Sequence, residues 1–297
     1  MSSNPNMQPR MPTTCAPIDL PYPTKRKKSS MKLCRFQPQI VPPERIGATS
    51  HPGVLQGVIS GEMVREISGE IFGRWTVTDR SWPLNDVKLL TPVVPSKIVC
   101  LGRNYVDHAA EFNNLPPTEP LIFLKPPSSL LAPDDVIVLP PNVKRIDYEG
   151  ELAIIISREC AHLEDTDDVR PFIAGYTLLN DVSARDYQAL DKQWTRAKAF
   201  DTFCPLGPVL ETEFDVASGH IETLLNGVRK QYSALTAMIF PVDVIIRWVS
   251  RVMTLVPGDV IATGTPAGVG PLKAGDVVEV VIDGIGTLRN PVMDLSI

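Results

Sequence analysis

Short apolar runs separated by turns characterise the first part of the chain. Alternating apolar and polar residues predict half-buried strands at Lys32–Phe36, Arg45–Thr49, Val54–Ile59 and Glu62–Ile67. The last two runs flank Ser60-Gly61, a pair that favours a hairpin turn. We therefore expect residues 31–91 to form a small N-terminal β-rich domain, followed by a stiff, extended link at Thr91–Pro95.

From Ser96 onward, longer apolar runs predict a larger domain that is rich in strands. The runs are bounded by turn residues, as expected of buried strands. They lie at Lys97–Leu101, Leu121–Lys125, Val136–Leu139, Leu152–Ser157, Ile173–Asn180, Val260–Thr263, Val277–Ile282 and Gly286–Leu288. Helices are predicted at Val106–Asn113, Val182–Asp191 and Pro241–Val252, and the last has apolar residues at helical spacing.

Strands outnumber helices, which predicts an α+β fold built as a β roll or sandwich. The chain has no GxGxxG after a first strand and no GxxxxGK[ST], so the sequence does not favour a dinucleotide-binding or P-loop fold. Residues 1–30 are polar and proline-rich, and we expect them to be a disordered basic leader. The expected division is therefore 1–30, 31–91 and a main domain at 92–297.

The composition is that of an ordinary globular enzyme, with 297 residues, 43% hydrophobic and 21% charged. The net charge of −5 argues against generic nucleic-acid binding, although the basic leader could be a nuclear address or bind a polyanion. No apolar run approaches the roughly 18 residues that span a bilayer, and no signal-peptide core is present. Five scattered cysteines without a CxxC pair indicate reduced thiols, so we expect a cytoplasmic protein. From its charge and hydropathy we expect this protein to bind neither nucleic acid nor membrane.

Two carboxylates, Glu149 and Glu151, precede the apolar run at Leu152. Alternate residues of a strand share a face, so the two side chains should project together from a sheet that continues into the core. Like charges repel at that spacing and burial increases the cost, which a bound cation would offset. The pair therefore predicts two ligands of a divalent metal, although Glu-x-Glu also occurs on exposed strand faces.

Asp181 is the best candidate for a third ligand because it follows the apolar strand that ends near Leu179. Three carboxylate ligands suit a hard ion such as Mg²⁺ or Mn²⁺, whereas zinc more often recruits His or Cys. The alternative is that Asp181 caps the helix that follows.

His108 and Glu111 lie three residues apart on a predicted helix, where their side chains face each other. The carboxylate would orient the imidazole and raise its basicity, as in a general-base dyad. The alternative is a local ion pair on the surface of a helix.

Two further features could contact an anionic substrate. Lys198 lies close to aromatic residues and could bind an oxyanion, although a lysine that extends along the surface is the alternative. The glycine-rich segment Ala262–Gly270 follows a strand, and its backbone amides and the Thr265 hydroxyl could hold an anionic group; a plain tight loop is the alternative.

Taken together, these motifs resemble the fumarylacetoacetate hydrolase family over roughly residues 96–292. The resemblance rests on several motifs that occur in the family's order. These are Gly102-Arg103-Asn104-Tyr105 with His108 and Glu111, Phe123-Leu124-Lys125-Pro126, Glu149-Gly150-Glu151, Asn180-Asp181-Val182-Ser183-Ala184-Arg185-Asp186, Lys198, and Thr263 to Gly270.

The resemblance implies a mixed β-sandwich roll with the small N-terminal domain of two-domain bacterial-type members, assembled as a homodimer. It also implies a Mg²⁺ or Mn²⁺ site, and a catalytic dyad on a segment that is often a mobile lid. The implied roles are metal binding by Glu149, Glu151 and Asp181, catalysis by His108, Glu111 and Lys198, and substrate binding by Arg103, Tyr105, Gln188 and Thr265.

The family's substrates are small 2-oxo acids or their enols. From the resemblance we expect hydrolysis of a C–C bond in an acylpyruvate-type substrate, with water activated by His108 and the enolate product stabilised by Lys198. Decarboxylation of oxaloacetate or keto–enol isomerisation could occur at the same site and remain alternatives.

Overall fold

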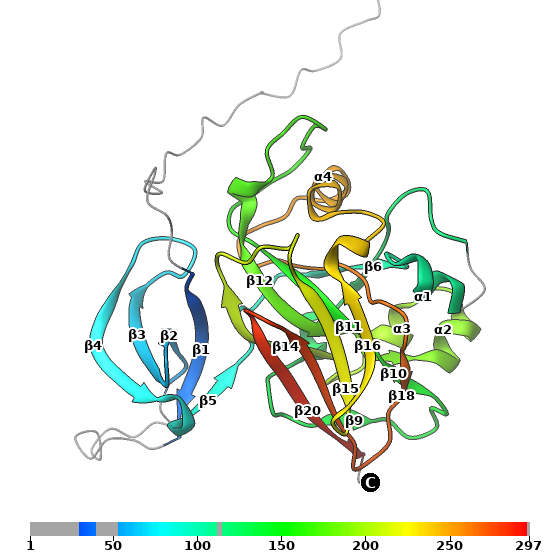
Figure 1. Cartoon of the computed structure of the whole chain (residues 1–297), viewed down its shortest axis with the longest axis horizontal. Helices are drawn as coiled ribbons and strands as arrows, with labels where there is room; N and C mark the ends of the chain where they lie inside the picture. The colour runs from blue at the N-terminus through cyan, green and yellow to red at the C-terminus, as the bar shows by residue number, and fades with distance from the viewer. Residues whose placement is uncertain (1–29, 40–52, 112–114, 296–297) are drawn as a thin grey trace, which may run out of the picture.

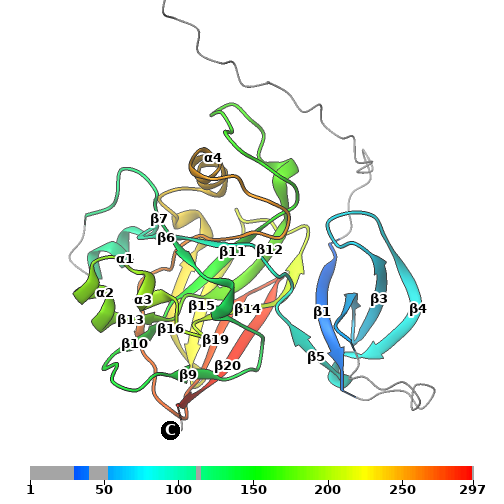
Figure 2. The same cartoon turned by 180° about the vertical axis from the view of Figure 1, so that it is seen from behind.

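A computed structural model of the chain describes residues 30–39, 53–111 and 115–295 (Figures 1 and 2). The N-terminal strands are β1 (Lys32–Pro38), β2 (Leu55–Ser60), β3 (Met63–Gly69), β4 (Trp75–Pro83) and β5 (Val87–Leu90). The expected hairpin joins β2 to β3, but its turn lies at Gly61-Glu62, one residue beyond the expected Ser60-Gly61. The strand expected at Arg45–Thr49 lies outside the described residues. The strand β4 was missed because most of its side chains are exposed, so its sequence lacks a clear apolar alternation.

The first strand connects these N-terminal strands to the rest of the molecule. β1 pairs antiparallel with β14 (Cys204–Glu211), with Lys32 opposite Glu211 and Leu33 opposite Leu210. The backbone N–H of Thr212 also donates to the Met31 carbonyl at 3.1 Å. One 12-stranded sheet therefore runs through both parts. Its order is β4, β3, β2, β1, β14, β12 (Ile173–Asn180), β11 (Gly150–Ile156), β17 (Val260–Ala262), β6 (Ile98–Gly102) and β7 (Leu121–Lys125), with β5 and β8 (Leu130–Leu131) at its side.

The strands of the main body form three sheets. The large sheet contributes β6, β7, β8, β11, β12 and β17. A five-stranded sheet has the order β16 (Val228–Ala234), β15 (His220–Leu225), β19 (Val277–Ile282), β20 (Gly286–Asp294) and β9 (Ile137–Leu139). The smallest sheet joins β13 (Ser183–Ala184), β10 (Ile146–Tyr148) and β18 (Gly270–Pro271).

Strand β11 shows how the layers pack, because every one of its residues is buried. Leu152 lies in a cluster with side chains of the five-stranded sheet, such as Val280, so this face of the large sheet packs against that sheet. Further along the same face, Ile154 packs against helix α4 (Val242–Val252). Ala153 and Ile155 point to the opposite face, which is lined by apolar residues of β6, β14 and β17.

The remaining helices are short and lie together at one side of the body (Figure 1). They are α1 (Val106–Glu111), α2 (Arg185–Asp191) and α3 (Thr195–Lys198). The expected helix at Val182–Asp191 is wrong in its first residues, because Ser183 and Ala184 pair with β10 as strand β13 and the helix begins at Arg185. None of the described helices is long and apolar enough to cross a membrane.

The expected α+β roll with a small N-terminal β-rich part is confirmed. Besides β4 and β5 and the short strands β8, β10, β13 and β18, the strands β14, β15 and β16 were not predicted. Strand β14 contains Pro205 and Pro208, which usually argue against a strand in the middle of a sheet. Strand β16 is mostly polar because it forms the edge of the five-stranded sheet.

Candidate active site

The chain changes sheets at Glu149, and this change brings the acidic residues together. Glu149 lies between β10, in the small sheet, and β11, in the large one. Its backbone N–H donates to the side-chain oxygen of Asn180 at 2.9 Å, and its carbonyl accepts the N–H of Asp181 at 2.8 Å. Asp181, which directly follows β12, is therefore held beside Glu149 although 32 positions separate them in the sequence.

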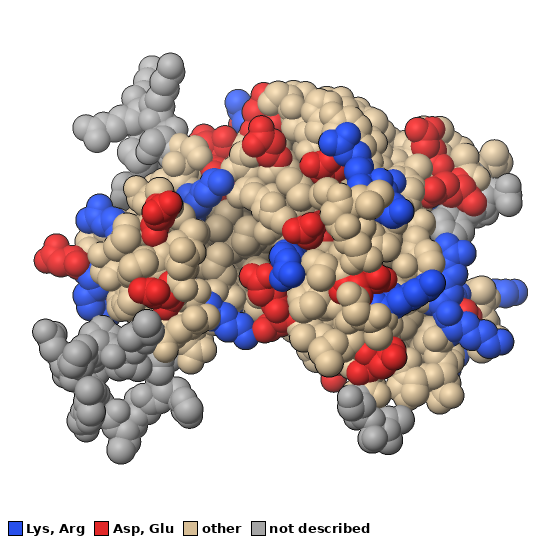
Figure 3. Space-filling view, turned by 60° about the horizontal axis from the view of Figure 1, so that its bottom comes forward, with Lys and Arg blue, Asp and Glu red and all other residues tan. Residues whose placement is uncertain are grey.

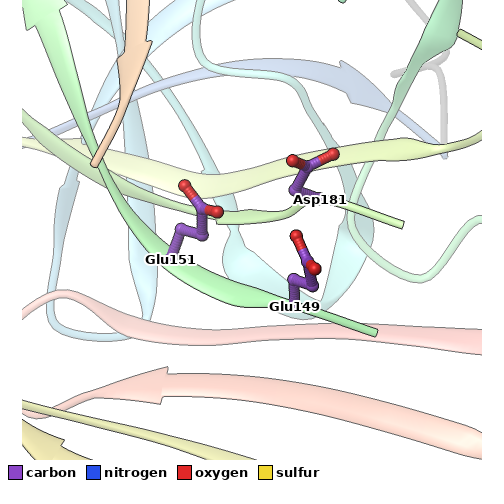
Figure 4. Close-up of side chains that lie close together, drawn as sticks. All are labelled: Glu149, Glu151 and Asp181. Carbon is purple, nitrogen blue, oxygen red and sulfur yellow. The ribbon is translucent and has the colours of Figure 1, made fainter. Parts of the chain in front are cut away.

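The side chains of Glu149, Glu151 and Asp181 converge on one point (Figure 4). One carboxylate oxygen from each lies within 4.8 Å of the others, and the residues are only 4%, 1% and 0% exposed. Glu149 and Glu151 do share one face of the chain, as the strand periodicity predicts. Three oxygen donors at this spacing have the chemistry that Mg²⁺ or Mn²⁺ requires.

Three basic side chains already neutralise two of these carboxylates. The Lys198 ammonium donates to Glu149 Oε2 at 2.8 Å and to Asp181 Oδ2 at 2.7 Å. Lys125 donates to the other oxygen of Asp181 at 2.6 Å, and Arg185 donates to Glu149 Oε1 at 2.6 Å. Burial by itself lowers the pKa of Lys198, but the charges of Asp181 and Glu149 outweigh it and raise that pKa, so Lys198 remains an ammonium.

Glu151 differs from its two neighbours, because it forms no ion pair with a Lys or Arg among the described residues. Its Oε2 accepts the backbone N–H of Gly264 at 2.8 Å. Burial, followed by the charges of Asp181 and Glu149, raises its pKa well above the usual value. An uncompensated, buried carboxylate next to two others is stabilised by a cation, so the residues present fit a divalent ion.

His108 and Glu111 also interact as expected. The two lie on α1, with His108 Nδ1 3.1 Å from Glu111 Oε2. His108 is only 6% exposed, so it is not part of an ordinary surface ion pair. The other oxygen of Glu111 accepts the backbone N–H of Gly268 at 2.7 Å, which fixes the carboxylate from its far side.

A cavity of about 460 Å³ is lined both by residues of the acidic cluster and by His108 of the His108–Glu111 pair. The acidic pair, the imidazole of His108 and the ammonium of Lys198 all line it, and Phe123 and Trp194 form part of an apolar wall. The remaining lining residues are Leu101, Gly102, Arg103, Arg185, Gln188, Ala189 and Thr265. Of the expected substrate-binding residues, Arg103, Gln188 and Thr265 therefore face this space.

Tyr105 does not line the cavity. It is 3% exposed and packs in the core with Leu152 and Met238, so the structure does not bring it together with the other expected substrate-binding residues. Asn104, its neighbour, instead fixes this segment, since its amide donates to the carbonyls of Thr263 at 2.8 Å and Phe240 at 3.0 Å.

The glycine-rich segment is neither a plain loop nor an open anion site. Two of its backbone amides bind carboxylates of the protein itself, with Gly264 donating to Glu151 and Gly268 to Glu111. The Thr265 hydroxyl donates to the Gly150 carbonyl at 2.9 Å. The segment therefore connects the acidic cluster to the dyad.

Two of the sequence alternatives are wrong. Asp181 does not cap α2, because the residue at the helix N-terminus is Ala184 and no side chain caps it. Lys198 does not extend along the surface, because it is only 2% exposed and its ammonium lies between two carboxylates.

Sequence reasoning assigned no role to Lys125 or Arg185, although both belong to quoted motifs. Lys125 follows four residues of strand β7 and is 1% exposed, where a lysine requires a buried anion. Arg185 bridges Glu149 and Asp147, with Nε 2.8 Å from Asp147 Oδ2. The available signal for Lys125 was a basic residue that directly ends an apolar run; no comparable signal marked Arg185.

Charges of both signs lie on one face of the molecule. On the face shown in Figure 3, Lys and Arg side chains are interspersed with Asp and Glu. The expected absence of nucleic-acid binding stays a prediction.

Two known protein families match this chain, one in each of its two parts. The family described as fumarylacetoacetate (FAA) hydrolase C-terminal matches residues 97–293, and the family described as Rv2993c-like, N-terminal matches residues 31–92. Protein Rv2993c of Mycobacterium tuberculosis is 49% identical over 260 residues, covering 84% of this chain and 98% of that protein.

Two relatives have informative names. The mitochondrial oxaloacetate tautomerase Fahd2a of Rattus norvegicus is 44% identical over 223 residues, or 71% of each chain. The crystal structure of 2-hydroxyhepta-2,4-diene-1,7-dioate isomerase from Mycobacterium marinum is 44% identical, with a TM-score of 0.80 over 90% of this chain and 100% of that one.

Proposed function

The chain belongs to the fumarylacetoacetate hydrolase family, and from this premise we propose that it catalyses proton transfer on a small 2-oxo dicarboxylate. Members of this family include hydrolases, isomerases and an oxaloacetate tautomerase, so the chain is assigned to a family of enzymes. Two relatives at 44% identity are a tautomerase and an isomerase, and both names describe movement of a proton or a double bond. We therefore propose isomerisation ahead of the hydrolysis expected from the family resemblance.

One observation supports the proposal above the others: His108 lines the same cavity as Glu149 and Glu151. A base that faces a carboxylate cluster across a cavity can reach a carbon atom next to a carbonyl group held at that cluster. The contact between Nδ1 and Glu111 favours the tautomer in which Nε2 accepts the proton.

The residues of the chain then have distinct roles. A divalent ion held by Glu149, Glu151 and Asp181 would bind the 2-oxo acid and polarise its carbonyl group. His108 takes a proton from the carbon next to that carbonyl and returns it to the product. Lys198 donates hydrogen bonds to oxygen atoms that gain negative charge, because it remains an ammonium beside the cluster.

Arg103 supports a dicarboxylate as the substrate. It lines the cavity, and its buried Nε has no hydrogen-bond partner among the described residues. Its φ of 62° is unusual for a residue other than glycine, and such conformations are concentrated at functional sites. A guanidinium in this position can pair with a second carboxylate at the far end of the substrate.

The substrate class is tested by exchanging Arg103 for Gln. With oxaloacetate, which has two carboxylates, we expect KM to rise at least tenfold because a charged pair is lost. With acetylpyruvate, which has one carboxylate, KM should change little. Equal losses on both substrates would contradict a role in recognising the second carboxylate.

The reaction is tested by incubating the enzyme with oxaloacetate and Mg²⁺ or Mn²⁺ in D₂O. NMR should detect exchange of the protons at C3 faster than in the uncatalysed control, and His108→Ala should lose that acceleration. Exchange at the uncatalysed rate in the presence of bound metal would reject proton transfer as the activity.

Hydrolysis is a second candidate, and the Glu111–His108 contact supports it because an oriented imidazole can also activate water. Product analysis with acetylpyruvate and fumarylpyruvate separates the two. Release of pyruvate together with a second acid indicates hydrolysis, whereas pyruvate with CO₂ from oxaloacetate indicates decarboxylation.

The homodimer implied by the family stays a prediction that sedimentation velocity would test.

A further inference from the structure

Gln231 is buried beside the acidic cluster although it belongs to a different sheet. It lies on β16, at the edge of the five-stranded sheet, and is 1% exposed. Its amide makes three hydrogen bonds, all with buried partner atoms. Oε1 accepts the N–H of Gly150 at 3.0 Å, and Nε2 donates to Thr265 Oγ1 at 2.8 Å and to the Pro266 carbonyl at 2.7 Å.

The partners of Gln231 are the segments that carry the carboxylates. Gly150 separates Glu149 from Glu151, so the orientation of its peptide groups determines how the two side chains project. Gln231 holds the N–H of Gly150, and the Thr265 hydroxyl holds its carbonyl at 2.9 Å. Both polar groups of this residue are therefore fixed by side chains from other segments.

The packing leaves little space for these segments to move. A Cβ on Gly150 would lie 2.2 Å from the Thr223 hydroxyl, so only glycine fits between the two glutamates. A Cβ on Gly268 would lie 2.1 Å from the carbonyl of Lys230, the residue before Gln231. Strand β16 therefore contacts both the glutamate segment and the loop that binds Glu111.

We propose that Gln231 is a positioning residue that holds the metal-binding carboxylates in register with the catalytic dyad. It fixes Gly150 directly and fixes the Thr265–Pro266 segment, whose neighbours Gly264 and Gly268 bind Glu151 and Glu111. This inference rests on the metal site of the proposed function. Gln231 itself would touch neither the substrate nor the ion.

The chemistry of the amide explains why glutamine is required. One end must accept a hydrogen bond from Gly150, and the other must donate two. Gln231→Glu keeps the shape and the acceptor but loses both donors and adds negative charge. Gln231→Met keeps the length of the side chain but loses all three hydrogen bonds.

The test measures metal binding separately from turnover. Metal-free wild-type protein and the two Gln231 variants are titrated with Mn²⁺ by calorimetry. Loss of the residues that orient metal ligands commonly weakens affinity by about 10 to 100-fold, and we expect a loss of this size in both variants. Both variants should also show a lower kcat, because the dyad shifts relative to the carboxylates.

Asn290 provides a matched control. It lies on β20 and is also 1% exposed, and its amide likewise donates two hydrogen bonds, to the carbonyls of Ala132 (2.9 Å) and Asp135 (2.8 Å). We expect both Asn290→Leu and Gln231→Met to lower the thermal unfolding temperature, but the affinity of Asn290→Leu for Mn²⁺ should stay at the wild-type value.

The outcomes separate this inference from the proposed function. Wild-type affinity in a folded Gln231→Met or Gln231→Glu variant would overturn the positioning role, and so would an equal loss in Asn290→Leu. If the Met variant does not fold, the isosteric Glu variant decides. Failure of the wild-type protein to bind Mn²⁺ would instead reject the metal site itself.

Discussion

Glu111 and Gly268 are joined by a hydrogen bond of 2.7 Å from the backbone N–H of Gly268 to Glu111 Oε1, while Glu111 Oε2 lies 3.1 Å from His108 Nδ1. The same loop binds Glu151 through Gly264. The His108–Glu111 pair and the acidic cluster are therefore held by one short segment, and separate predictions can be made for the proposed metal binding and the proposed proton transfer.

His108→Ala should remove turnover without removing the metal. General-base catalysis commonly contributes about 10² to 10⁴-fold, and we expect a loss of kcat in that range. Calorimetric titration with Mn²⁺ should give an affinity close to that of the wild-type protein, because His108 is not one of the three proposed metal ligands. Wild-type turnover in this variant would remove the dyad from the mechanism.

Glu151→Gln and Asp181→Asn should both lose the divalent ion but should differ in stability. Glu151 has no basic partner among the described residues, and burial raises its pKa, so its replacement by a neutral amide should not destabilise the metal-free protein. Asp181 pairs with Lys125 and Lys198, so its neutralisation leaves the buried Lys125 ammonium without an acidic partner, while Lys198 keeps Glu149. We expect a loss of about 3–5 kcal/mol for Asp181→Asn, measured by denaturant unfolding without metal.

Metal itself should stabilise the wild-type protein and neither variant. At a concentration 100 times Kd, an ion that binds only the folded state adds about 2.7 kcal/mol to the free energy of unfolding. EDTA should abolish this gain and catalysis together. Retention of full metal occupancy by either variant would show that the ligand assignment is wrong.

Lys198 should not form a Schiff base with a 2-oxo acid. Asp181 and Glu149 outweigh the effect of burial and raise its pKa, so the amine lacks the free electron pair that attacks a carbonyl. Incubation with pyruvate and borohydride, followed by mass spectrometry of the peptides, should detect no reduced adduct at Lys198. An adduct at this residue would contradict its role as a charged hydrogen-bond donor.

The buried thiols should make the protein less stable at alkaline pH. Burial raises the pKa of Cys160 to about 11 and those of Cys34 and Cys204 to about 12, from an ordinary value of 9.0. Above pH 9 the unfolded chain loses these protons while the folded chain keeps them. Stability is therefore complete below pH 9 and falls as the pH rises toward 11 or 12, by about 1.4 kcal/mol per pH unit for each thiol.

Urea unfolding between pH 8 and pH 11 measures this slope. Cys204→Ala should reduce the slope by about one thiol's contribution, whatever its effect on stability at pH 8. An unchanged slope in the variant would contradict the assignment of a raised pKa to Cys204.

The short-range patterns of the sequence predicted two of the arrangements in the candidate site. Strand periodicity placed Glu149 and Glu151 on one face, and helical spacing placed His108 beside Glu111; the structure has both arrangements. These relationships depend on a few neighbouring residues, whose geometry the backbone of a strand or a helix determines. The strands with proline or with exposed polar residues, such as β14 and β16, lack that periodicity and were missed.

The sequence by itself determined the class of fold, the two carboxylates on one face, and the imidazole–carboxylate pair. Only the tertiary structure decided which distant groups complete them: Asp181 beside Glu149, Lys125 and Lys198 between carboxylates, and Gln231 against Gly150. The reason is physical. Local periodicity records the direction in which a side chain points, whereas the partners of a buried charge or amide are chosen by sheet order and by the need to satisfy every polar group removed from water.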